Sequence, residues 1–135
     1  MDAYTRYQAD KIMTASPEQL IRMLLDRAVA ELEIGRGLLD DSRWQDAAPH
    51  LSKAQDIVTE LRCSLNLEAG GQIASNLDAL YDFAFRRIVD GQIQHEASII
   101  GEVVSVLDPI RDAWTTAVCG AAAPVTELRS VGAGA

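Results

Sequence analysis

The chain has 135 residues, a formal net charge of -8 and a hydrophobic fraction of 48%. This is the size of one domain with one core, and the apolar content excludes a disordered chain. The excess of acidic residues disfavours nucleic-acid binding, because phosphate groups would be repelled over most of the surface.

Two cysteines, Cys63 and Cys119, lie too far apart in the sequence to form a disulfide framework or a CxxC site. The first residues lack the positive and apolar regions of a signal peptide. No apolar run of about 18 residues is present to span a membrane. We therefore expect a cytoplasmic protein that does not insert into a membrane.

The first predicted helix starts after Ser16 and continues to about Leu39. Ser16 is a candidate N-cap, Pro17 fits the first helical position, and Gln19 completes a capping box. Apolar residues then recur at helical spacing. The helix start is therefore predicted from local chemistry as well as from periodicity.

An arm of residues 1–15 precedes this helix. It carries two aromatic residues, Tyr4 and Tyr7, with little other apolar sequence around them. Aromatic side chains in a terminal arm favour packing against another surface, because their apolar area is large. We therefore expect the arm to lie against the rest of the protein or against a partner.

The second helix is predicted from about Asp46, with Pro49 in its first turn. Its apolar residues have the alternating spacing of three and four that suits antiparallel bundle packing. They are Leu51, Ala54, Val58, Leu61 and Leu65.

The remaining helices are predicted between glycine-rich connections. A turn at 68–71 precedes a third helix over about 72–90, which Gly91 is expected to end. A fourth helix follows over about 95–118, and Pro109 predicts a kink in it. Short connections between four amphipathic segments predict an all-α antiparallel four-helix bundle over residues 16–119. The tail at 120–135 is rich in Gly and Ala and is expected to be disordered.

The third and fourth helices carry more apolar surface than a bundle helix normally buries. A second stripe beside the main one makes the apolar arc of the fourth helix about 180° wide, against about 100° for most bundle helices. This stripe includes Ile100, Val104 and Leu107, and Tyr81 and Phe85 flank the seam of the third helix. Either these helices are the more deeply buried pair, or their surplus forms a groove for an amphipathic helix of a partner. The arm with the two tyrosines would then close or clamp this groove.

No pattern indicates a catalytic site, a cofactor or a metal site. Neither His50 nor His95 follows the Glu-x-x-His spacing of diiron bundles, and Ile99 replaces the second histidine of a zinc-protease motif. A histidine phosphotransfer module remains an alternative, because His50 precedes Lys53 closely in a helical protein. Its position directly after Pro49 is more typical of solvated surface.

Motifs along residues 4–118 resemble those of one known family. They include Tyr4 and Tyr7, the helix opening at 14–21 with Met23 and Leu24, Lys53 to Gln55, Glu60, Leu61, Leu65, Asn76, Leu77, Leu80, Tyr81, Arg86, Arg87, Glu102, Val103 and Arg111 to Trp114. Together and in this order, they resemble the flagellar secretion chaperones of the FliS type. Leu25 stands where an aromatic residue is common in that family, and Gly91 and Pro109 are further departures.

The resemblance implies a cytosolic, non-enzymatic chaperone of type III export that uses no nucleotide, cofactor or metal. Its partner would be the disordered C-terminal segment of flagellin, which it would keep unpolymerised and competent for export. Export-gate components and flagellar regulatory proteins are further candidate partners. We expect the binding residues to be Tyr4, Tyr7, Tyr81, Phe85, Ile100, Val104 and Leu107. The alternative is a generic helical adaptor or regulatory bundle that self-associates through the same groove.

Overall fold

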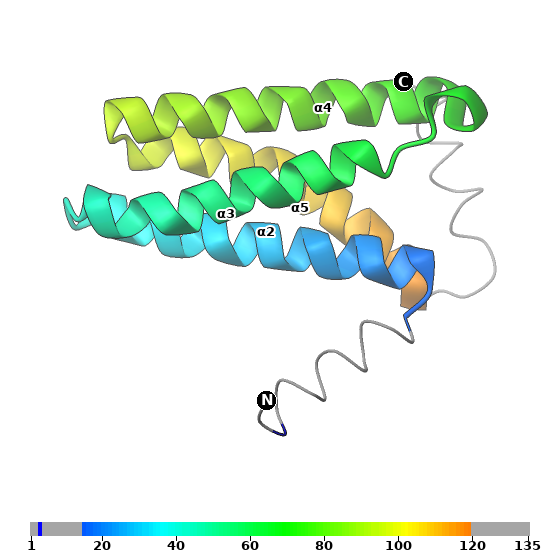
Figure 1. Cartoon of the computed structure of the whole chain (residues 1–135), viewed down its shortest axis with the longest axis horizontal. Coiled ribbons are helices and arrows are strands. Elements are labelled where there is room, and N and C mark those ends of the chain that lie inside the picture. The colour runs from blue at the N-terminus through cyan, green and yellow to red at the C-terminus, as the bar shows by residue number, and fades with distance from the viewer. Residues whose placement is uncertain (1–2, 4–14, 120–135) are drawn as a thin grey trace.

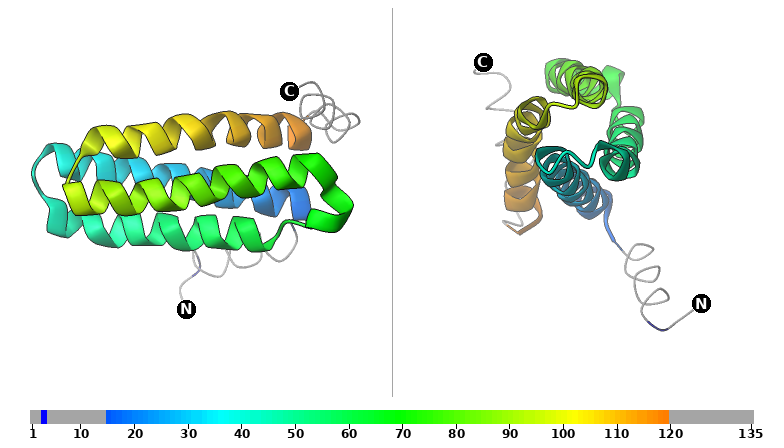
Figure 2. Two further views of the ribbon diagram at one scale, coloured as in Figure 1. Left: turned by 90° about the horizontal axis from the view of Figure 1, so that it is seen from above. Right: turned by 90° about the vertical axis from the view of Figure 1, so that its left-hand side faces the viewer.

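The computed structural model describes residue 3 and residues 15–119, and within them it contains four α-helices and no strand (Figure 1). The helices are α2 (Pro17–Asp40), α3 (Trp44–Cys63), α4 (Leu67–Gln94) and α5 (Ala97–Cys119). Successive helices run in opposite directions and form the antiparallel bundle that the sequence predicts (Figures 1 and 2). The predicted tail at 120–135 and most of the arm lie outside the described residues.

Helix α2 begins with the predicted capping box. The backbone N–H of Gln19 donates to Ser16 Oγ at 3.2 Å, and the backbone N–H of Ser16 donates to Gln19 Oε1 at 2.8 Å. Pro17 occupies the first turn, where its missing N–H leaves no intrahelical bond unmade. The prediction of this helix start is confirmed.

Helix α3 begins at Trp44, slightly before the predicted start at Asp46. Pro49 consequently lies inside the helix rather than in its first turn, and it is exposed. Because Pro49 has no N–H, it cannot donate to the carbonyl one turn before it, and water can reach that carbonyl on the exposed face.

Helix α4 is longer than predicted at both ends. It starts at Leu67, and Gly71, with φ 55° and ψ -133°, separates a first helical turn from the rest. The prediction that Gly91 ends this helix is wrong, because the helix continues to Gln94 and His95 takes the left-handed C-cap position. Gly91 is instead buried and lies against the side chain of Ile100 of α5.

Each helix of the bundle contacts two neighbours. Helix α2 contacts α3 and α5, and α4 contacts the same two helices from the other side. Helix α5 begins beside the C-terminal end of α4 and crosses obliquely to end near the start of α2 (Figures 1 and 2). It continues through Pro109, whose side chain is exposed. The bundle is therefore tight at the end that holds the α4–α5 connection and wider at the opposite end.

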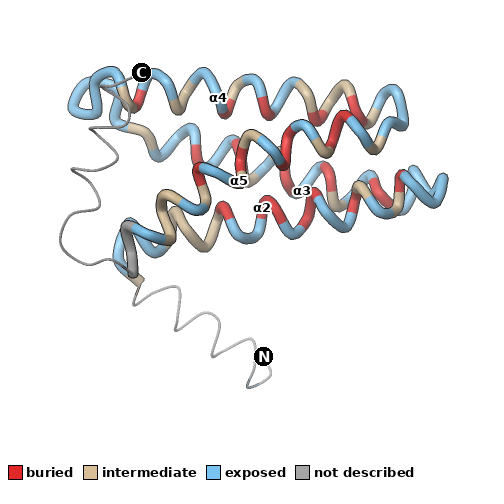
Figure 3. Tube along the Cα trace, turned by 180° about the vertical axis from the view of Figure 1, so that it is seen from behind, coloured by how far each residue is buried: buried red, intermediate tan, exposed pale blue. Residues whose placement is uncertain are grey.

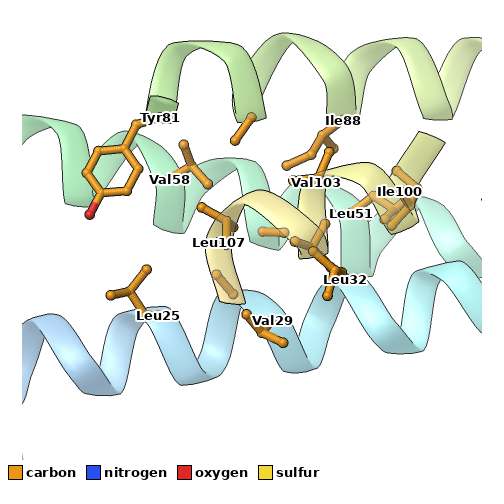
Figure 4. Close-up of a cluster of buried hydrophobic side chains, with 14 of the residues drawn as sticks. Leu25, Val29, Leu32, Leu51, Val58, Tyr81, Ile88, Ile100, Val103 and Leu107 are labelled. Carbon is orange, nitrogen blue, oxygen red and sulfur yellow. The ribbon is translucent and has the colours of Figure 1, made fainter. Parts of the chain in front are cut away.

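The predicted open groove along α4 and α5 is wrong for four of its five residues. Ile100 and Leu107 are fully buried, Val104 is 9% exposed and Tyr81 is 1% exposed. Figure 4 shows Ile100, Leu107 and Tyr81 within the buried cluster. Helix α5 buries a wide arc because it packs against both α2 and α4. These four side chains belong to the core, and the buried residues of the four helices lie mainly on the sides that face the inside of the bundle (Figure 3).

Candidate functional site

An apolar cavity of about 590 Å³ lies at the wide end of the bundle. It is bordered by the start of α2, the α3–α4 connection, the first half of α4 and the last turns of α5. These segments meet where α5 has moved away from α4 towards α2 (Figure 2). The apolar lining residues are Ile21, Leu65, Ala69, Ile73, Ala74, Leu77, Tyr81 and Trp114.

The α4 wall of this cavity continues the apolar stripe of the core. Ile73, Leu77 and Tyr81 recur every four residues and therefore share one face of the helix. Tyr81 is buried, whereas Ile73 and Leu77 are only half-buried. In Figure 4, Tyr81 marks the edge of the labelled core cluster, with its ring directed towards the side of α2 that carries Leu25. The same stripe thus fills the core at one end and lines the cavity at the other.

The inner wall of the cavity carries no charged side chain among the described lining residues. Removal of the phenol from water raises the pKa of Tyr81 to about 12. The opposite wall is formed by Ile21 of α2 and Trp114 of α5, which are both half-buried. The cavity can therefore accept apolar side chains without leaving a charge unsolvated beside them.

The rim of the cavity is polar and lies at the start of α2. Glu18 is the charged residue among the described lining residues, and Ser64 and Asn66 border the rim on the other side. Glu18 is exposed and lies in the first turn of α2, where a negative charge is favourable. The arm of residues 1–15 joins the chain directly beside this rim, at Ser16.

Ion pairs tie the end of α3 to α4 beside the cavity. The guanidinium of Arg62 lies 2.6 Å from Asp78 Oδ1 and 3.0 Å from Asp82 Oδ1. The hydrogen bond from Arg62 lowers the pKa of Asp78. Because all three side chains are partly exposed, the pairs mainly orient the helices and add little stability.

The structure brings one of the predicted site residues to the cavity. Tyr81 lines it, whereas Ile100, Val104 and Leu107 belong to the core and are not part of the lining. Phe85 is 36% exposed and lies on the flank of α4 that faces α3. Tyr4 and Tyr7 lie outside the described residues.

Five of the larger apolar lining residues were not among the predicted site residues: Ile21, Leu65, Ile73, Leu77 and Trp114. Their periodicity is identical to that of core residues, so it predicts an inward direction and nothing more. Their common feature is that all five lie at the wide end of the bundle. That feature identifies a cavity only when the crossing of α5 is known.

Other classes of site find no support in the part of the chain that the structure describes. Residues 15–119 contain no group of three or more His, Cys, Asp or Glu side chains placed to hold a metal ion. No helix among them is long and apolar enough to cross a membrane. His50, the candidate for phosphotransfer, bonds to Glu31 of α2.

Comparison with known proteins gives one consistent family. The family described as flagellar protein FliS matches residues 1–121 of this chain. The flagellar secretion chaperone FliS of Salmonella typhimurium is 38% identical over 114 residues, which are 83% of this chain and 84% of that protein. The corresponding protein of Vibrio cholerae is 31% identical over 115 residues, which are 84% of this chain and 85% of that protein.

A solved structure shares the fold. The crystal structure of a flagellar chaperone from bacteria superposes with a TM-score of 0.71 at 27% sequence identity. The superposition covers 87% of this chain and 96% of that chain. The similarity therefore extends over most of the chain and includes the helical fold.

Proposed function

Since this chain belongs to the FliS family of flagellar secretion chaperones, which are not enzymes, we propose that it binds the C-terminal segment of flagellin in the cytoplasm. The bound segment would be kept from polymerising and would remain competent for export. The apolar cavity at the wide end of the bundle is the observation that carries this proposal.

The cavity suits an amphipathic helix that folds as it binds. A disordered client loses conformational entropy when it is ordered, and burial of apolar area at about 25 cal/mol per Å² must offset that loss. Half-buried side chains such as Ile73, Leu77 and Trp114 present solvent-accessible apolar area within one concave site. Anchoring side chains of the client would enter here, and the remaining contacts would extend over the helices around it.

The arm of residues 1–15 is part of this proposal. Its last residue is next to Ser16, and Glu18 already lines the rim, so the arm starts within reach of the cavity. Tyr4 and Tyr7 carry the apolar area needed to cover the site when the client is absent, or to contact the client when it is bound. In either role the arm would change the affinity for the client.

Isothermal titration calorimetry with a peptide of the flagellin C-terminal segment tests the proposal. We expect one peptide to bind per chain with a negative heat-capacity change, because apolar surface is buried. The control peptide carries serine at the apolar positions of the predicted helix and should not bind. Equal binding of both peptides, or of neither, would contradict the proposal.

The alternative is a helical adaptor that self-associates through the same cavity. Light scattering of the pure protein distinguishes the two functions, because a cavity filled by a second copy gives a stable dimer. A monomer that becomes a one-to-one complex with the flagellin peptide supports the chaperone. A dimer that the peptide does not dissociate supports the adaptor.

A further inference from the structure

We propose that the segment Asn66–Gly70 is a movable wall of the cavity, that Gly71 is its hinge, and that the wall swings outward when a client helix enters. This inference rests on the proposed function for the identity of the client. It concerns how access to the cavity is controlled. It is carried by the geometry of the segment, by its local bonding and by the size of the cavity.

The wall lines the cavity and is hydrogen-bonded mainly within itself, and Leu65, directly before it, packs against the core. Several of its residues line the cavity, and the outer residue Leu67 is 54% exposed. The N–H of Ala69 donates to Asn66 Oδ1 at 3.0 Å, and the N–H of Gly70 donates to Asn66 O at 2.7 Å. The hydroxyl of Ser64 donates to Leu61 O at 2.7 Å. The bonds to Asn66 stay within the segment and can move with it, whereas the bonds of Ser64 and Leu65 tie the chain before it to α3.

The backbone angles of Gly71, rather than crowding around it, explain why this position is a glycine. Gly71 has φ 55° and ψ -133°, a region that L-residues rarely adopt. A Cβ at this position would meet nothing within 4 Å, so crowding does not explain the glycine. If Gly71 took ordinary helical angles, α4 would straighten through it and carry the turn at 67–70 away from the cavity.

A second glycine is also adapted to the bent form. A Cβ at Gly70 would lie 2.6 Å from the Cβ of Ala74. In a continuous helix, residues four apart have Cβ atoms about 5–6 Å apart, so this crowding exists only while α4 is bent. Gly70 and Gly71 together permit the bent form, while the rest of the segment is compatible with a straight helix. Two conformations of the wall are therefore sterically accessible.

The cavity is small compared with a client helix, which favours a site that can enlarge. One turn of helix with its side chains is a cylinder about 10–12 Å wide and 5.4 Å long, which is roughly 420–610 Å³. The cavity of about 590 Å³ thus holds about one turn. A client helix of several turns is longer than this space, so part of it would lie beyond the present lining, and outward movement of the wall would enlarge the site on one side.

Chirality at the hinge provides the test. A D-residue favours the mirror image of the angles that an L-residue favours, and the mirror image of the Gly71 conformation is ordinary extended backbone. Gly71→D-Ala therefore locks the bent form, and Gly71→Ala favours the straight form. Both variants and the unchanged chain can be made by ligation at the exposed Cys63, which leaves no other change. All three carry the same core, and circular dichroism checks that each is folded.

Stopped-flow binding of the flagellin C-terminal peptide is the first measurement. We expect Gly71→D-Ala to bind about 10-fold more slowly than the unchanged chain, and Gly71→Ala to bind at least as fast. Equal rates for Gly71→D-Ala and the unchanged chain would overturn the proposal. So would weaker binding of Gly71→Ala alone, because the wall would then be needed where it is.

Amide hydrogen exchange of residues 66–70 is the second measurement and needs no client. We expect Gly71→D-Ala to slow exchange of this segment about 10-fold relative to the unchanged chain, with the rest of α4 unaffected. Unchanged exchange would overturn the hinge even if no flagellin peptide bound. Failure of the unchanged chain to bind any flagellin peptide, with the exchange result as expected, would instead reject the proposed client.

Discussion

The side chain of Ile100 on α5 packs directly onto the backbone of Gly91 on α4. A Cβ at Gly91 would lie 2.5 Å from Cδ1 of Ile100 and 3.1 Å from its Cγ1. Ile100 is fully buried, so its side chain has little room to turn away. This contact draws α4 and α5 together at one end of the bundle, opposite the end that holds the cavity.

Replacement of Gly91 by alanine tests this contact. Although alanine is the better helix former, we expect Gly91→Ala to lower the free energy of unfolding by about 1–3 kcal/mol, because the new methyl group overpacks the core. Gly37→Ala is the matched control, since a Cβ there meets nothing, and it should stabilise by about 0.5–1 kcal/mol. Urea denaturation measures both. A double variant with Ile100→Val removes the clashing atom, and failure of this rescue would contradict the explanation.

The raised pKa of Tyr81 predicts a loss of folding stability at alkaline pH. Its pKa is raised from 10.0 to about 12 in the folded protein because the phenol is buried. Above pH 10 the unfolded chain releases this proton while the folded chain retains it, so stability falls between pH 10 and 12. At about pH 11 the loss should be about 1 kcal/mol. Tyr81→Phe should not show this contribution, and identical pH profiles of the two proteins would count against it.

The burial of Tyr81 also limits its use in binding experiments. Tyr81→Ser would remove a fully packed ring, and loss of a large buried side chain to a small one costs about 3–5 kcal/mol. Weaker flagellin binding by that variant would therefore report unfolding as much as lost contacts. Phe85→Ser lacks this problem but lies away from the cavity lining.

The lowered pKa of Glu31 predicts a loss of folding stability at acidic pH. Its carboxylate is 6% exposed, accepts from His50 Nδ1 at 2.7 Å and accepts from Arg27 Nε at 2.9 Å. Burial acts to raise the pKa of Glu31, but the hydrogen bonds and charges of His50 and Arg27 outweigh it and hold the pKa below 4.5. The stability from this group is thus present above pH 4.5 and is lost as the pH falls through the lowered value.

Glu31→Gln isolates that contribution. We expect the variant to be about 1.5 kcal/mol less stable at neutral pH, the usual value for hydrogen bonds to a charged group. The difference in melting temperature from the unchanged protein should shrink as the pH falls through the lowered pKa of Glu31, because the folded protein then carries a neutral carboxyl group at this position. A difference that stays constant down to acid unfolding would show that the charge of Glu31 contributes nothing.

Ile73 provides the cleanest test of the cavity. It lines the cavity but does not belong to the set of residues packed against the core. We expect Ile73→Ser to weaken binding of the flagellin peptide at least 10-fold, or about 1.4 kcal/mol, by calorimetry. Ile93→Ser is the matched control, because it makes the same change on α4 at a site that is 71% exposed and outside the cavity lining. Equal effects of the two substitutions would move the binding site elsewhere.

The arm is tested by deletion of residues 1–12. We expect the affinity for the flagellin peptide to change, and the direction identifies the role of Tyr4 and Tyr7. A higher affinity means that the arm competes with the client, and a lower affinity means that it contacts the client. Tyr4→Ser with Tyr7→Ser should reproduce the effect of the deletion. An unchanged affinity in both proteins would leave the arm without a part in binding.

The glycines show where prediction from sequence ends. From the local sequence, Gly71 was predicted to lie in a turn and Gly91 to end a helix. Both predictions follow from the preference of glycine for left-handed C-cap positions. Gly71 does bend the chain, but inside α4, and Gly91 has a packing role. A glycine that serves a cap and one that admits a neighbouring side chain look the same in sequence. The neighbour, Ile100, lies on another helix.

The residues of the candidate site, too, could be predicted from the sequence only in part. The wide apolar arc of α5 correctly indicated unusual burial, but the arc alone does not tell whether a second helix of the same chain or a partner covers it. Packing of α5 against both α2 and α4 buries Ile100, Val104 and Leu107, while Tyr81 reaches the cavity because α5 turns away from the first half of α4.

The sequence by itself determined the four helices, the Ser16 cap, the antiparallel order and the family, because caps, periodicity and motifs depend on residues within a few turns of one another. Only the tertiary structure decided which apolar side chains are enclosed and which line a cavity. That choice depends on the angle at which α5 crosses its neighbours, and the angle results from contacts between residues distant in the chain, such as Gly91 with Ile100 on α5.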